Sequence, residues 1–105
     1  MGLTLFQLTY YNLRGRAEII RYVLLAGNID FEDERIERSN WPSVKNTYKL
    51  PAGQIPIVTL TDGTILNESI AIARFFATQV DLAGITPLEK YQCDRSIYTV
   101  LILLS

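Results

Sequence analysis

The sequence predicts an α/β domain with a mixed β-sheet, and three patterns support this. An alternating strand pattern at residues 4–10 precedes an amphipathic helix pattern at 17–26 and a second strand pattern at 29–36. A β-α-β unit of this kind implies parallel strands joined by a crossover. A short helical stretch, a hairpin pattern at 55–66 and a further helix follow. The predicted order is therefore βαβ, helix, ββ and helix.

The first three elements carry clear boundary signals. The strand at 4–10 is rich in β-forming residues, and the helix at 17–26 repeats its apolar residues on one face. Gly27-Asn28 is a good helix stop. The strand at 29–36 is heavily charged, so we expect it at a sheet edge, where charge discourages unwanted pairing.

The middle of the chain is less regular. Residues 39–48 predict a short, irregular helix with Pro42 suited to its first position. Residues 50–54 predict a loop. Pro56 cannot donate a backbone hydrogen bond, so it must lie at the start of the strand that follows.

Turn and helix signals complete the chain. Asp62-Gly63 predicts the hairpin turn, and Glu68-Ser69 opens a helix that runs through Ala77. The apolar rows expected on this helix are Ile70, Ala73, Ala77 and Ile72, Phe75, Phe76. Pro87 starts the last helix, which continues to the end of the sequence.

Composition excludes several function classes. The chain has 105 residues, of which 49% are apolar, and a net charge of -1, so it has a globular core and lacks the basic footprint of a nucleic-acid-binding protein. It contains no histidine and one cysteine, Cys93, which excludes an intrachain disulfide, a CxxC motif and most common nucleophile–base pairs. We predict no metal site. The N-terminus shows no signal-peptide pattern, so we expect a cytoplasmic protein without a membrane partner.

The run at residues 9–18 carries the strongest chemical signal. Tyr10 ends a strand just before a helix, and its hydroxyl is expected near the helix N-terminus, between Arg14 and Arg16. That environment would hold an anion, including a thiolate. The alternative is that Tyr10 is a core aromatic residue, since tyrosine is common in strands.

Two backbone positions allow both a structural and a functional interpretation. Ile55-Pro56 is either a simple entry to the strand or a cis peptide bond. In the cis case the backbone groups of Ile55 would turn outward and could pair with an extended peptide. Glu68-Ser69 is either a helix cap or a site where a carboxylate meets free N–H groups and an ammonium meets Glu68.

Trp41 and Lys45 lie one helical turn apart. They are either a buried indole and a solvated lysine, or an indole N–H and an ammonium that reach one carboxylate. Together with the positions above, the second interpretation predicts a groove for a small peptide with a carboxylate at each end and a reactive atom near Tyr10.

The predicted element order matches a thioredoxin-like core, but the missing CxxC motif argues against a dithiol oxidoreductase. Four stretches, residues 8–22, 41–42, 53–57 and 68–74, together with residues 81–84, give a more specific resemblance. On these motifs the chain resembles the N-terminal domain of a glutathione transferase, and is most similar to the sigma class.

This resemblance implies a glutathione site. Tyr10 would donate a hydrogen bond to the glutathione sulfur, and Arg16 would support Tyr10, which makes these two the catalytic residues. Trp41, Lys45 and Gln54 would hold the glycyl carboxylate. Ile55, beside a cis Pro56, would pair with the cysteinyl backbone, and Glu68 and Ser69 would hold the γ-glutamyl end. The implied binding set is Tyr10, Arg16, Trp41, Lys45, Gly53, Gln54, Ile55, Pro56, Glu68 and Ser69.

The family also implies an activity and an assembly. A glutathione thiolate would attack a small hydrophobic electrophile, by conjugation or prostaglandin-type isomerisation, in a homodimer that serves detoxification. Residues 1–82 would be the glutathione-binding domain, and 83–105 a linker and the start of the first helix of an absent all-helical domain.

Two departures keep an alternative open. Leu101 and Ile102 stand where the sigma class usually has an acidic pair, and the chain stops inside the helix. These features suggest a truncated or alternatively spliced product. The alternative function is a non-catalytic glutathione-binding or crystallin-like interaction module.

Overall fold

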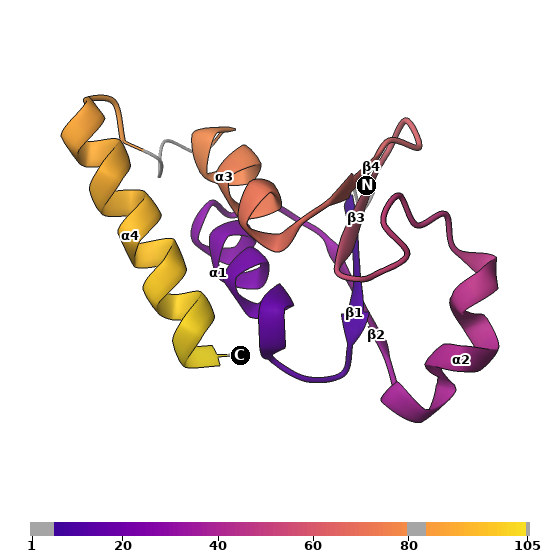
Figure 1. The fold of residues 1–105 in the computed structure, drawn as a ribbon. Helices are drawn as coiled ribbons and strands as arrows, with labels where there is room; N and C mark the ends of the chain where they lie inside the picture. Colours follow the sequence, from indigo (N-terminus) through magenta and orange to yellow (C-terminus); the bar gives the residue numbers. More distant parts are fainter. Residues whose placement is uncertain (1–5, 80–83, 105) are drawn as a thin grey trace. The chain divides into compact units, whose positions relative to one another are not determined.

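The computed structural model describes residues 6–79 and 84–104, with side chains described as far as Ile97 (Figure 1). Its elements, in chain order, are β1 (Phe6–Tyr11), η1 (Gly15–Ala17), α1 (Glu18–Ala26), β2 (Glu32–Ile36), η2 (Arg38–Asn40), α2 (Trp41–Val44), η3 (Lys45–Thr47), β3 (Ile57–Leu60), β4 (Ile65–Asn67), α3 (Ser69–Gln79) and α4 (Pro87–Leu104). This order confirms the predicted α/β class and the predicted succession of elements.

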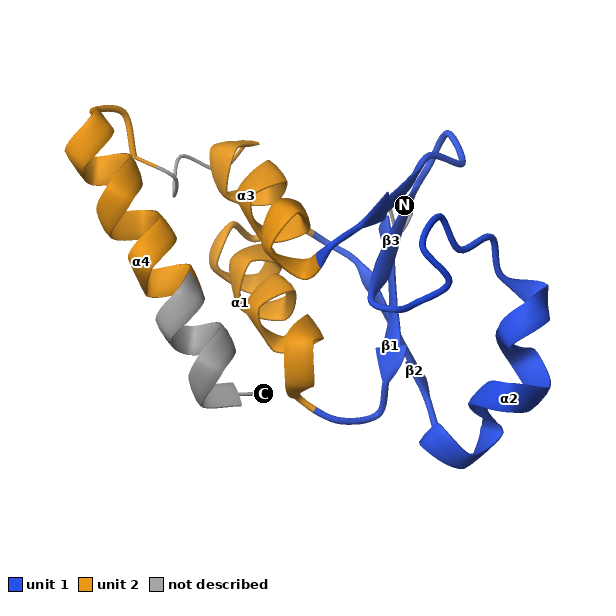
Figure 2. Ribbon diagram, viewed as in Figure 1, with its two compact units in different colours: residues 1–13, 30–68 blue, residues 14–29, 69–105 orange. Residues whose placement is uncertain are grey.

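The chain divides into two compact units (Figure 2). Unit 1 comprises residues 1–13 and 30–68, and unit 2 comprises residues 14–29 and 69–105. Each unit is thus assembled from two separate stretches of chain. The predicted domain boundary between residues 82 and 83 falls within the segment 80–83, which lies outside the described residues, and it stays a prediction.

Unit 1 contains a four-stranded mixed sheet in the order β2-β1-β3-β4. β1 pairs in parallel with β2 and antiparallel with β3, while β3 and β4 form the predicted hairpin. β2 lies at an edge, as its charge predicted. β1 is an interior strand, and its residues Leu8, Thr9 and Tyr10 are all buried. The simple alternation expected from the sequence is therefore replaced by burial on both faces, as is usual for an interior strand.

The hairpin turn follows from its Asp-Gly pair. Gly63 has a φ of 90°, in the left-handed region that favours glycine, and its N–H donates to the carbonyl of Leu60 at 3.0 Å. The Asp62 carboxylate accepts the N–H of Thr64 at 2.9 Å, and these hydrogen bonds lower the pKa of Asp62. β3 begins at Ile57, so Pro56 precedes the ladder as predicted.

Unit 2 is a set of packed helices in which α1, α3 and α4 contact one another (Figure 2). The predicted apolar face of α1 is buried, as are Ile72 and Phe76 of α3. Phe75 was expected on an apolar row but is 40% exposed. The physical reason is helical periodicity: the buried residues 72, 73, 76 and 77 form one face, and position 75 falls outside it.

α1 ends at the predicted stop. The N–H of Gly27 donates to the carbonyl of Val23 at 2.9 Å, and that of Ile29 donates to Leu24 at 2.9 Å. Asn28 has a φ of 57°, a left-handed conformation that asparagine tolerates. The last carbonyl groups of the helix are satisfied in this way.

The N-terminus of α4 is closed by a capping box. The Glu89 carboxylate accepts the N–H groups of Ile85 and Thr86 at 3.0 and 2.9 Å, and the Thr86 hydroxyl accepts the N–H of Glu89 at 3.1 Å. Gly84 has a φ of 81°, and a Cβ there would lie 2.7 Å from the Cβ of Glu89. None of the helices in the described part of the chain has the length and apolar character to cross a bilayer.

The hydrogen bonds at this cap lower the pKa of Glu89 from 4.5, so the ionised form is favoured in the folded state. Their contribution to stability is fully present above the pKa that Glu89 has in the unfolded chain. It is lost as the pH falls through the lower pKa of Glu89 in the folded state. We therefore predict that Glu89→Ala lowers the free energy of unfolding at neutral pH, and that the difference from the wild type shrinks in acid. Urea unfolding at a series of pH values measures this.

Ser96→Ala is the matched control, because Ser96 lies in the same helix and its hydroxyl bonds only to the carbonyl of Gln92. This variant should show no comparable pH dependence. A Glu89→Ala difference that is the same at pH 7 and in acid would contradict the role of the ionised carboxylate.

Candidate functional site

The C-terminal end of β1 holds the residue with the strongest chemical signal. Tyr10 is 8% exposed, and its ring centroid lies 5.2 Å from that of Tyr11, with the two planes 56° apart. This burial agrees with a core aromatic residue, yet a hydroxyl that stabilises a thiolate also acts most strongly away from water. The contact between the Tyr10 hydroxyl and a bound thiol therefore stays a prediction.

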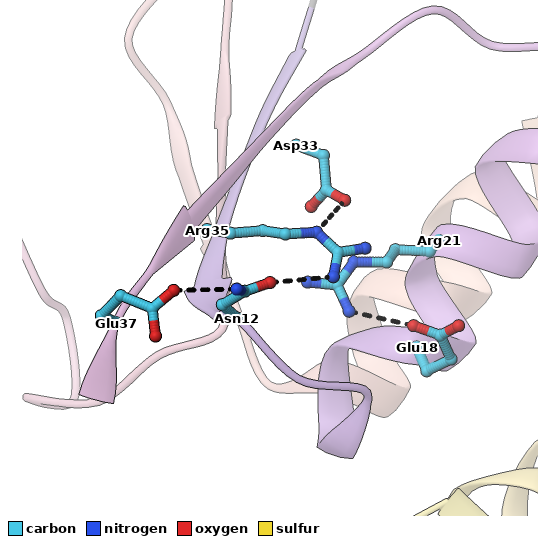
Figure 3. A network of polar contacts seen from close by, with 6 residues as sticks. All are labelled: Asn12, Glu18, Arg21, Asp33, Arg35 and Glu37. Carbon is cyan, nitrogen blue, oxygen red and sulfur yellow. Dashed lines mark hydrogen bonds and ion pairs between the residues drawn. The ribbon is translucent and has the colours of Figure 1, made fainter. Parts of the chain in front are cut away.

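A polar network joins the ends of the two parallel strands (Figure 3). The side chain of Asn12 donates to Glu37 at 2.8 Å and accepts from Arg35 at 3.3 Å, while Arg35 also donates to Asp33 at 2.9 Å. The backbone N–H of Asn12 donates to the carbonyl of Ile36 at 3.0 Å. These contacts tie the exit of β1 to the exit of β2, where the irregular helical segment begins.

Unit 2 has an ion pair of its own and holds the predicted residues Arg16 and Ser69. Figure 3 shows Arg21 donating to Glu18 at 2.9 Å along α1, and Arg21 is only 3% exposed. Arg16, the second predicted catalytic residue, lies in η1 and is exposed. Ser69 is the first residue of α3 and is 7% exposed.

The segment after β2 contains the predicted carboxylate-binding pair. Trp41 is the first residue of α2, and the N–H of Lys45 donates to its carbonyl group, so the two residues are one helical turn apart as predicted. Trp41 is half-buried and Lys45 is exposed. Within residues 6–79 and 84–104, neither the indole N–H nor the ammonium group has a hydrogen-bond partner.

The indole of Trp41 lies in an aromatic cluster, defined here as Tyr11, Trp41 and Tyr48. The ring of Trp41 meets Tyr11 edge-on at 6.0 Å and lies 5.8 Å from Tyr48 at an interplanar angle of 36°. The guanidinium of Arg38 sits 5.4 Å from the centre of the Tyr11 ring, within cation–π range. The indole is therefore held between a strand residue and a residue that follows η3.

Tyr48 is itself anchored to the sheet. Its hydroxyl donates to Oε1 of Glu34 at 3.0 Å, and the hydroxyl of Thr9 donates to the same oxygen at 2.9 Å. Burial, this hydrogen bond and the negative charge of Glu34 raise the pKa of Tyr48 from its ordinary value of 10.0. The phenol consequently keeps its proton and remains a donor at neutral pH.

The loop before β3 carries four predicted binding residues. Gly53 has a φ of 71°, and a Cβ there would meet nothing within 4 Å, so backbone conformation and not space favours glycine. Gln54 is exposed, and the Ile55–Pro56 bond is cis. Among the described residues the backbone N–H and C=O of Ile55 have no partner.

Glu68 and Ser69 sit at the junction between β4 and α3. Glu68 is exposed and has a φ of 71°, and it precedes the helix, which begins at Ser69. The sequence had predicted that Glu68 and Ser69 open the helix together. In the described part of the chain the Ser69 hydroxyl makes no hydrogen bond, which gives the helix-cap interpretation no support.

Sequence reasoning missed Tyr11, Tyr48, Glu34 and Thr9 as parts of the site. Only one of them had a readable signal: Tyr48 follows Trp41 by seven residues, two helical turns, a spacing that places side chains on one face. Across 6–79 and 84–104, no three His, Cys, Asp or Glu side chains gather in a way that could hold a metal ion.

Residues 6–78 match the protein family described as Glutathione S-transferase, N-terminal domain. The chain belongs to this family. The match covers all the elements of the mixed sheet as well as α1 and nearly all of α3, so the fold is the thioredoxin-like one that the element order predicted.

Individual relatives agree with this assignment. Human hematopoietic prostaglandin D synthase is 47% identical over 95 residues, which are 90% of this chain and 46% of that protein. The sigma class GST of Fasciola hepatica has a TM-score of 0.71 at 41% identity, covering 82% of this chain and 42% of that one. Monomeric Na-GST-3 from the hookworm Necator americanus has a TM-score of 0.77 at 37% identity, and the match covers 95% of this chain and 48% of that chain. The chain spans about half the length of the relatives it matches.

The Tyr48–Glu34 contact gives a direct prediction. Glu34→Gln removes the negative charge that disfavours the phenolate, so the pKa of Tyr48 should fall toward 10.0. NMR titration of the protein with ring-labelled tyrosine follows this group. Glu37→Gln is the matched control, because that carboxylate bonds to Asn12 and not to Tyr48. If the pKa of Tyr48 is the same in the wild type and in Glu34→Gln, a contact between the Tyr48 hydroxyl and a charged Glu34 carboxylate is excluded.

Proposed function

We propose that this chain is the glutathione-binding part of a sigma-like glutathione transferase, in which the Tyr10 hydroxyl donates a hydrogen bond to the glutathione sulfur. Membership of the family carries this proposal. The position of Tyr10 near the C-terminal end of an interior strand supports it, because the strand pairs on both sides as far as Thr9 and Tyr10 itself pairs with β2.

The chemical benefit is a larger supply of nucleophile. A free thiol has a pKa near ~8.5, so only a few per cent is thiolate at neutral pH. A preorganised donor aimed at the sulfur favours the charged form. Lowering the thiol pKa by about two units corresponds to roughly 2.7 kcal/mol of preferential thiolate binding. Arg16 supports Tyr10 and the negative charge beside it.

The remaining residues hold the tripeptide. Trp41, Lys45 and Gln54 bind the glycyl carboxylate, and the absence of internal partners for the indole N–H and the Lys45 ammonium within the described residues favours this role. Ile55, preceding Pro56 and following Gly53 and Gln54, pairs with the cysteinyl backbone. Glu68 and Ser69 bind the γ-glutamyl end, with Glu68 meeting its ammonium.

The electrophile is a small hydrophobic molecule. The thiolate attacks an electrophilic carbon in conjugation, or an endoperoxide in a prostaglandin-type isomerisation; the name of the human relative, hematopoietic prostaglandin D synthase, favours keeping the second reaction. Conjugation would place the protein in detoxification, and the sequence features given above favour a cytoplasmic location.

Replacing Tyr10 tests the proposal. Hydrogen bonds to charged partners are worth ~1.5–3 kcal/mol, so Tyr10→Phe should reduce conjugation of an aromatic halide by about 10- to 150-fold. Glutathione affinity, measured by calorimetry, should change much less. Tyr11→Phe is the matched control, since Tyr11 is the next residue of the same strand and its described contacts are made through its ring.

The outcomes separate the two candidate functions. Loss of turnover in Tyr10→Phe alone supports the transferase. Binding of glutathione without turnover in either form supports the non-catalytic or crystallin-like module. Absence of glutathione binding in the wild type contradicts both.

We also propose that the chain forms a homodimer. Unit 2 exposes large apolar side chains at Leu25, Ile85, Leu88 and Tyr91, which are 66%, 88%, 64% and 62% exposed, and such surface favours association. The apolar run at residues 100–104 is also expected to favour association, but its side chains lie outside the described residues. The Necator americanus relative is named as monomeric, so the assembly of this chain has to be measured directly.

Sedimentation velocity at micromolar concentration measures the assembly. The expected result is a dimer or larger species in the wild type and a shift toward monomer in a Leu25→Ser, Leu88→Ser double variant. A wild-type monomer across this range would refute the homodimer.

A further inference from the structure

We propose that Tyr48 is a positioning residue for Trp41, so that the Tyr48–Glu34 contact sets the affinity of the site for the glycyl carboxylate of glutathione. The inference rests on the proposed function for the identity of the ligand. It concerns residues that lie entirely within unit 1.

The first step is the anchor. Oε1 of Glu34 accepts hydrogen bonds from Thr9 of β1 at 2.9 Å and from Tyr48 at 3.0 Å. Thr9 is 1% exposed, so one of the two donors is fixed in the interior of the sheet. Hydrogen bonds to an ionised acceptor are stronger than neutral ones. Glu34 thus connects the Tyr48 ring to the buried part of β1.

The second step is the contact of the two rings. The ring centroids of Tyr48 and Trp41 lie 5.8 Å apart at an interplanar angle of 36°, and those of Tyr11 and Trp41 lie 6.0 Å apart at 85°. The segment that carries Trp41 consists of a four-residue helix between two short 3-10 turns, which has little rigidity of its own. Contacts with these two rings therefore decide the orientation of the indole.

The third step links orientation to binding. The indole N–H has no partner in the described part of the chain, and Lys45 follows one helical turn later. A carboxylate can be held by both groups only if the indole N–H points along one direction. Freeing the ring to rotate would add an entropic cost to binding at this end of the tripeptide alone.

Trp41 is the one tryptophan of the chain, so its fluorescence reports its own environment. In the protein without ligand, Tyr48→Leu should increase acrylamide quenching of this emission, whereas Tyr48→Phe, which keeps a ring at 48, should do so less. Tyr22→Leu on the exposed surface of α1 is the control and should leave quenching unchanged.

Affinity is measured with two probes, glutathione and γ-glutamylcysteine, which lacks the glycine. An aromatic contact contributes enough that Tyr48→Leu should weaken glutathione binding by roughly 3- to 10-fold. Binding of γ-glutamylcysteine should be unchanged, and Tyr48→Phe should recover part of the glutathione affinity. A general structural defect would weaken both probes equally, which is why the pair of ligands is used.

The possible results distinguish the inference from the proposed function. Selective loss of glutathione affinity together with increased quenching supports the inference. Equal loss for both probes, or no loss for either, overturns it while leaving the proposed function intact. If the wild type binds neither probe, the proposed function itself fails and this inference fails with it.

Discussion

The hydrogen bonding of β1 on both sides is the constraint on which unit 1 depends. The strand pairs with β2 from Gln7 to Tyr11 and with β3 from Phe6 to Thr9. Pairing with both neighbours therefore fixes the strand as far as Thr9, and pairing with β2 continues through Tyr10 and Tyr11. The residue proposed for chemistry and the residue that contacts Trp41 thus follow each other on one fixed strand.

The charges of β2 serve more than one purpose. They protect an edge strand from unwanted pairing, as the sequence suggested. Two of them also make specific contacts: Arg35 reaches Asn12 at the end of β1, and Glu34 accepts hydrogen bonds from Thr9 and Tyr48. The edge strand thereby fixes the start of the helical segment that carries Trp41. This connects a feature of the fold to the proposed recognition of a carboxylate.

Much of this architecture could be predicted from local signals. The Asp62-Gly63 turn, the stop after Ala26 and the place of Pro56 before its strand each follow from the conformational limits of one or two residues. The family followed from long matching motifs. Burial of both faces of β1 could not be predicted in the same way, because it depends on the position of the strand in the sheet.

The Tyr48–Glu34 contact also could not be predicted from the sequence. The two residues are 14 positions apart on different elements, and the charge of Glu34 already had a sufficient explanation at the edge of the sheet. Periodicity along α3 misplaced Phe75 for a related reason, since several apolar rows were available and only packing selects one. The binding roles of all the predicted site residues, Tyr10 and Trp41 as much as Glu68 and Ser69, rest on the family resemblance and stay predictions.

The pKa of the thiol of bound glutathione tests the central claim most directly. It is obtained from the ultraviolet absorbance of the thiolate as the pH of the complex is varied. The account predicts a value well below the ~8.5 of a free thiol in the wild type, and a return toward that value in Tyr10→Phe. The same pKa in both proteins would contradict it, because the phenol would then make no difference to the charge on sulfur.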